Sequence, residues 1–177
     1  MPLQHNHLDD STRKFMLAEI ERDVASSKLY LSDNLSEKGR IDYVNLLKSA
    51  ASNSNDVSLA QEISTRLNSH EKPRQLKSGG FSQPPVMRSN AHEMLAEGEF
   101  NRFYMRAICL RAIEDGIKSV VVYRAKEVAN PRSASEEMLG KHMSPATLLQ
   151  DLRAHVGVDT ALGLPPGPNS GLCICFP

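Results

Sequence analysis

The three cysteines and six histidines are the side chains of this 177-residue chain best suited to chemistry. Cys173 and Cys175 lie two positions apart, so both would face the same side of a strand. A metal site would need two further ligands, for which His142 and His155 are nearest in sequence. Zinc sites usually separate paired cysteines by about two to four residues. The spacing therefore favours small buried residues of a terminal strand over a metal or redox centre.

Nucleophilic catalysis finds no support in the sequence. Cys109 lies between Ile108 and Leu110, which predicts a buried and inert thiol because a reactive one needs a base and partial exposure. The pattern G-x-S-x-G is absent, and the prolines of GLPPGPNSG remove backbone donors that a phosphate-binding loop needs. We therefore predict a non-enzymatic protein with no catalytic residue, no cofactor and no metal.

The stretch from Glu99 to Arg124 is the most apolar and continuous part of the chain. It predicts a long helix over 99–115, stopped at Gly116, and then a strand over 118–124 that is covered on both faces. The terminal LCICF predicts a last strand, paired with residues 120–123. These elements predict an α+β fold, with an N-terminal helical layer followed by a small core with a long central helix and few strands.

Three regions follow from the pattern along the chain. Residues 1–67 read as a helical region with a loose start at 1–10. Residues 68–90 form a linker or arm rich in proline and glycine, and residues 91–177 form the α+β core. Gly98 predicts a kink or a boundary between two helices. Six helix starts are predicted at capping residues: Asp10 or Ser11, Ser36, Asp56, Asn90 with Glu93, Ser133 with Glu136, and Ser144 followed by Pro145.

Charge disfavours a dedicated nucleic-acid binder. Lys and Arg number 21, as do Asp and Glu, and residues 1–80 carry 11 of each sign. Phosphate binding usually requires a basic excess, although a local patch remains open. The odd cysteine count and the lack of a signal peptide favour a cytoplasmic protein. Because no apolar run is long enough to span a membrane, we expect no membrane contact.

Partner contacts are expected in three places. The central helix carries arginines that form either a solvated face, with ion pairs such as Glu99–Arg102, or a contact with an acidic partner. The linker and the rigid proline-rich loop are the other two. The candidate contact residues are Arg102, Arg106, Arg111, Arg74, Lys77, Pro165, Pro166 and Asn169.

The stretches EGEFNRFYMRAICLRAIEDG, VYRAKEVANPRSASE and GLPPGPNSGL, within residues 95–172, resemble parts of uncharacterised proteins from bacteriophages and prophages. The resemblance carries no functional residue over. It implies a phage setting and a capsid- or tail-associated virion component. Together with the residue pattern, it leads us to expect an assembly protein that contacts a protein partner or itself. The alternatives are a small nucleic-acid-binding regulator that uses the arginines and the basic linker, and a Cys/His metal or redox protein.

Overall fold

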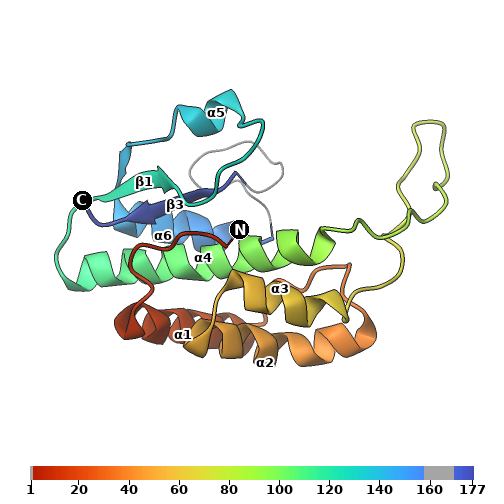
Figure 1. The fold of residues 1–177 in the computed structure, drawn as a ribbon, viewed down its shortest axis with the longest axis horizontal. Helices are drawn as coiled ribbons and strands as arrows, with labels where there is room; N and C mark the ends of the chain where they lie inside the picture. Colours follow the sequence, from red (N-terminus) through yellow and green to blue (C-terminus); the bar gives the residue numbers. More distant parts are fainter. Residues whose placement is uncertain (1, 158–169) are drawn as a thin grey trace.

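The computed structural model describes residues 2–157 and 170–177, and it confirms the α+β class (Figure 1). The first three helices are α1 (Asp10–Ala25), α2 (Glu37–Asn53) and α3 (Asp56–Ser64). The long helix α4 (Ala91–Glu114) is followed by the short α5 (Ser133–Glu136) and by α6 (Pro145–Ala154). The strands are β1 (Val120–Arg124), β2 (His142–Met143) and β3 (Leu172–Cys175).

Helix α4 is the centre of the molecule. In Figure 1 it runs between α1, α2 and α3 on one side and α6 with the sheet on the other. It packs against α1, α3, α6 and β3. Most of its apolar side chains between Phe100 and Ala112 are buried, whereas Ile113 near its end is exposed. The helix is continuous through Gly98, so of the two alternatives predicted there, a boundary between two helices is wrong.

Several predicted helix ends are confirmed. The Ser36 hydroxyl accepts a hydrogen bond from Gly39 N at the start of α2, and Ser144 precedes Pro145 at the start of α6. Gly116 follows the end of α4 with φ of 69°, a left-handed conformation that costs glycine little. These local signals set the lengths of the elements around the core.

Two other caps lie one or two residues earlier than predicted. Asp9, rather than Asp10 or Ser11, accepts a hydrogen bond from Thr12 N and caps α1. Asn55, rather than Asp56, accepts from Ser58 N and caps α3. In both helices the capping oxygen bonds the backbone N–H three residues ahead, so the predicted residues fall inside the helix.

The three strands form an antiparallel sheet in the order β2-β1-β3. The predicted pairing of the last strand is confirmed, because Val121 pairs with Cys175 and Tyr123 with Cys173. Val122 on one face is buried, but Val121 and Tyr123 on the other are only half-buried. The expectation that both faces of β1 are fully covered is therefore wrong.

The N-terminal segment is packed on this core, which corrects the expectation of a loose start. Leu3 is buried, and Gln4 N donates to Ala125 O at 2.8 Å. His5 lies against the Tyr104 ring, with the ring centroids 4.3 Å apart. The apolar Leu3 and the paired backbone explain why these polar-looking residues are ordered.

None of the helices in the described part of the chain is both long enough and apolar enough to cross a membrane.

Candidate functional site

Residues 68–90 form a two-stranded arm that projects from the body between α3 and α4 (Figure 1). Antiparallel bridges join His70 to Val86 and Gln75 to Phe81. Gly79 and Gly80, with φ of 86° and 80°, make the turn at the tip, where Leu76 N donates to Gly80 O. The segment predicted as a linker or arm is therefore a hairpin arm.

The arm exposes apolar side chains. Phe81 is 71% exposed, and Leu76 and Val86 are also exposed. Each would gain about 1.5–3 kcal/mol if fully buried, so together they are a sizeable driving force for contact. Phe81 was not among the predicted contact residues, although a phenylalanine inside a polar, proline-rich segment is itself a signal of such a contact.

The arm also has an excess of basic residues. It holds four basic residues, Lys72, Arg74, Lys77 and Arg88, against the single acid Glu71, which gives a net charge of +3. Because the whole chain has a net charge of zero, the rest carries −3. Glu71 pairs with Arg88 at 2.6 Å and with Arg74 at 3.7 Å. The tip therefore keeps exposed cations beside exposed apolar groups.

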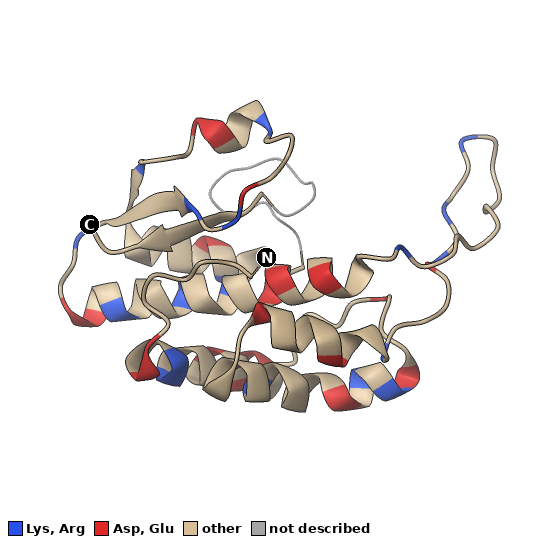
Figure 2. Cartoon of the chain, in the orientation of Figure 1, with Lys and Arg blue, Asp and Glu red and all other residues tan. Residues whose placement is uncertain are grey.

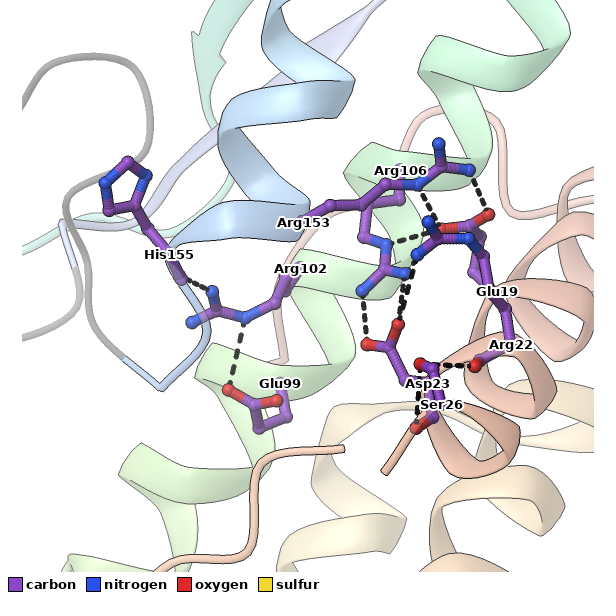
Figure 3. A network of polar contacts seen from close by, with 9 residues as sticks. All are labelled: Glu19, Arg22, Asp23, Ser26, Glu99, Arg102, Arg106, Arg153 and His155. Carbon is purple, nitrogen blue, oxygen red and sulfur yellow. Dashed lines mark hydrogen bonds and ion pairs between the residues drawn. The ribbon is translucent and has the colours of Figure 1, made fainter. Parts of the chain in front are cut away.

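The central arginines do not form the exposed face that the sequence predicted. Arg106 is 0% exposed, and its guanidinium binds Asp23 through two nitrogens at 2.6 and 2.8 Å (Figure 3). Its Nε donates to Glu19 at 2.6 Å, and Arg153 of α6 binds the same carboxylate. The cluster joins α1, α4 and α6, which makes Arg106 a structural residue rather than a surface contact.

Arg102 lies one helical turn earlier and is also buried. Its Nε donates to Glu99 at 3.2 Å, and a terminal nitrogen donates to the carbonyl of His155 (Figure 3). The predicted Glu99–Arg102 pair is confirmed, but it lies inside the protein rather than on a solvated face. Burial raises the pKa of Glu99, against the opposing charge of Arg102.

Arg111 is the most accessible of the three arginines, yet only 17% of its side chain is exposed. It donates to both oxygens of Asp9 at 2.9 Å and to the Thr12 hydroxyl at 2.6 Å. Its guanidinium also lies over the Phe176 ring, 5.2 Å from the centroid. Its prediction as an exposed contact is therefore also wrong, because the side chain ties α4 to the start of α1 and to the last strand.

The cysteines show no reactive arrangement. Cys109 and Cys173 are fully buried, and burial raises the pKa of each thiol to about 12. Cys175 is half-buried on the same strand as Cys173. Across residues 2–157 and 170–177, no group of three or more His, Cys, Asp and Glu side chains is placed to hold a metal ion. The buried thiols therefore behave as small core residues.

A cleft of about 360 Å³ opens beside the first half of α4. Its wall combines apolar side chains such as Leu95 and Met105 with the charged pairs Glu99–Arg102 and Glu97–Lys126. The volume fits a small ligand. The charged groups on its wall are already paired, so the cleft does not by itself select a ligand class.

A smaller groove of about 200 Å³ lies between α3 and α4 and is acidic. Asp56, Glu93 and Glu97 line it with one cation, Lys126, which pairs with Glu97. Asp56 is 1% exposed, and its Oδ2 accepts from Leu3 N at 3.1 Å. Its Oδ1 has no hydrogen-bond partner, and burial raises its pKa.

The remaining predicted contact residues fall into two groups. Arg74 and Lys77 lie on the arm with Phe81, as the sequence predicted for that segment. Pro165, Pro166 and Asn169 lie outside the described residues. The acidic groove was missed because its two walls are far apart in sequence, and no local pattern marks which helices pack together.

Comparison with family models, curated proteins and solved structures finds no match for this chain.

Proposed function

We propose that this chain is a non-enzymatic assembly protein that contacts a protein partner through the arm. The single observation that supports the proposal is the projecting hairpin with Leu76, Phe81 and Val86 exposed on it. The resemblance to phage proteins gives the specific setting, a virion component that is capsid- or tail-associated. In that setting the compact body serves to hold the arm.

Docking on a partner would be energetically favourable for the arm. A two-stranded hairpin alone is marginally stable in water, and its apolar side chains gain nothing while they face solvent. Docking would bury them, and the hairpin's existing backbone hydrogen bonds lower the entropy cost of ordering the segment. Aromatic and arginine side chains such as Phe81 and Arg74 are the types enriched where proteins meet.

Site-specific photocrosslinking tests the proposal. A photoreactive phenylalanine analogue is placed at position 81, and a matched analogue at position 41 of α2. Ile41 is 72% exposed, so the two positions differ in place and not in accessibility. We expect protein adducts from position 81 in producing cells, and none from position 41. Equal yields from both positions, or none from either, would overturn the proposal.

The charge of the arm favours a second candidate function, nucleic-acid binding. An arm with a net charge of +3 and an exposed aromatic side chain could contact phosphates and stack on a base. The net charge of −3 on the rest of the chain opposes this. Electrophoretic shift with single- and double-stranded DNA and RNA at about 50 mM salt tests it, since phosphate contacts are strongest at low salt. A shift that Lys77→Glu removes would support it, and no shift would reject it.

A further inference from the structure

We propose that the arm of one copy docks in the acidic α3–α4 groove of a second copy of this chain. The inference rests on the proposed assembly function and names its partner. It joins two surfaces that the structure keeps apart within one molecule, the tip of the arm and the groove lined by Asp56, Val57, Ala60, His92, Glu93 and Glu97.

Charge is the first support. The tip carries Arg74, whose side chain is 73% exposed, and Lys77, which makes no ion pair within the described part of the chain. The groove carries three carboxylates and one ammonium, a net charge of −2 when Asp56 is ionised. Figure 2 shows the same division, with blue positions along the arm and red positions on α3 and the first turns of α4. Opposite potentials of this kind steer and orient two surfaces.

Size and polarity are the second support. A cavity of about 150 Å³ is known to hold a benzene molecule, so a groove of about 200 Å³ can admit a phenyl ring. Val57 and Ala60 supply an apolar wall on the α3 side, and Val57 is exposed. Phe81 of an incoming arm could pack against them while Lys77 approaches Glu93, which is exposed at the start of α4.

The unpaired Asp56 Oδ1 is the third support. A buried carboxylate oxygen without a partner carries an energetic cost, and an arriving cation would reduce it. The groove's existing cation, Lys126, is bound to Glu97 and not to Asp56. Because Asp56 is enclosed, a guanidinium or ammonium from outside would favour its ionised form through charge rather than by direct contact.

A second copy suits these surfaces better than the chain's own arm or a polyanion. The arm extends away from α3 and α4 in Figure 1, and its tip side chains are exposed. The groove and the negatively charged body would repel nucleic acid but attract a basic arm. Arm and groove are different patches, so the contact is head-to-tail and gives either a closed ring or an open chain.

Charge reversal tests the contact in the full-length protein. Sedimentation velocity and light scattering are measured over a wide concentration range at low and high salt. We expect reversible self-association that weakens with salt. Lys77→Glu on the arm and Glu93→Lys in the groove should each weaken it at least tenfold, and the combined variant should restore it. Lys38→Glu, an exposed reversal on α2 away from both surfaces, should leave it unchanged.

Thermal unfolding of each variant checks that the fold is intact. We expect it to be intact in Glu93→Lys, because Glu93 is exposed in the first turn of α4. A monodisperse monomer at every concentration would overturn the inference. Failure of the combined variant to restore association would also overturn it. A Lys77→Glu variant that loses an electrophoretic shift with an oligonucleotide but associates normally would do the same.

The crosslink at position 81 separates this inference from the proposed function. In a mixture of isotopically light and heavy protein, light–heavy adducts to the α3–α4 groove support docking in a second copy. Light–light and heavy–heavy adducts alone place the arm in its own groove and overturn it. Adducts to a different protein, without self-adducts, overturn the second-copy inference and leave the assembly function standing.

Discussion

Arg106 of the central helix forms buried ion pairs with neighbouring helices. Its guanidinium is fully enclosed and satisfied by two carboxylates, while Arg153 shares one of them. Burial opposes the ionisation of Glu19, but its bonds to Arg153 and Arg106 outweigh this and lower its pKa. The charged residues of α1, α4 and α6 therefore fix how these helices pack, and they offer little to a partner.

Removing the Arg106 charge should be severely destabilising. In Arg106→Met, Asp23 would remain buried without its guanidinium, which typically costs about 3–5 kcal/mol in unfolding free energy. Chemical denaturation measures the loss. Lys48→Met is the control, because Lys48 makes an exposed pair with Glu21, and such pairs contribute about 0.2–1 kcal/mol. Similar losses in the two variants would contradict the role given to Arg106.

His5 makes stability depend on pH in mildly acidic solution. Burial lowers its pKa from 6.5 to about 4, although the hydrogen bond that His5 Nε2 donates to Asn101 Oδ1 opposes the shift. The unfolded chain takes up a proton near pH 6.5, whereas the folded chain does so only near pH 4. The stability that His5 supplies is therefore complete above pH 6.5 and is lost as the pH falls from 6.5 towards 4.

His5→Gln should remove part of that dependence. We expect the unfolding free energy of the wild type to fall between pH 7 and pH 5 by more than that of the variant. Denaturant titrations at the two pH values give the comparison. His142→Gln, at an exposed position, should keep the wild-type slope. If His5→Gln keeps that slope as well, the neutral buried histidine is not its source.

Single residues also show where sequence reasoning stops. Cys109 was predicted to be buried because its neighbours are apolar, and this is confirmed. The burial of Arg106 was not predicted, because its partners lie more than eighty positions earlier in the chain. A charged residue on an apolar helix can face solvent or a buried partner, and only the packing of α1 decides between them.

At the level of the elements, the start of α2 depends on a close approach to the end of α3. The Arg66 carbonyl accepts from both the backbone N–H and the hydroxyl of Ser36 at 2.9 Å. A Cβ built on Gly39 would lie 2.2 Å from that carbonyl oxygen. Glycine normally weakens a helix, but Gly39 is what lets the two segments meet.

Gly39→Ala should therefore destabilise the helical layer, despite the higher helix propensity of alanine. Because the clash is with backbone, the two helices must shift apart, and overpacking of this kind typically costs about 1–3 kcal/mol. Thermal or chemical unfolding measures it. Lys38→Ala, at the exposed neighbouring position, should change stability little. A stabilised Gly39→Ala would mean that the approach to Arg66 is not required.

The elements that carry their own local signals were predictable. Caps and glycine stops mark α2, α4 and α6, and the β-branched run marks β1. The two-residue strand β2 and the hairpin pairing of the arm were not predicted. Both depend on backbone partners elsewhere in the chain, which side-chain pattern alone does not reveal.

For the whole molecule, the central feature is the separation between a packed body and a projecting arm of opposite charge. The sequence located the arm through its prolines and glycines. It did not show the acidic groove, because that groove forms only where α3 packs on α4. The function proposed above depends on a contact between molecules rather than on a site inside one.

Replacing the arm distinguishes its part in self-association from the stability of the body. Met87 N donates to Ser69 O at 2.9 Å, so residues 70–86 can be exchanged for a two-residue Asn-Gly turn that joins paired ends. The buried core contains no residue of the removed segment, so the midpoint of chemical unfolding should stay close to that of the full chain. Self-association should be lost.

The controls for this replacement use charge and fold. Removing residues 70–86 takes away three basic residues and one acidic one, so the shortened chain carries a net charge of −2 and should bind an anion exchanger more tightly. Retention that changes as expected, with the unfolding midpoint preserved, establishes an intact body. Self-association that persists in this protein would place the contact on the body and remove the arm from the mechanism of assembly.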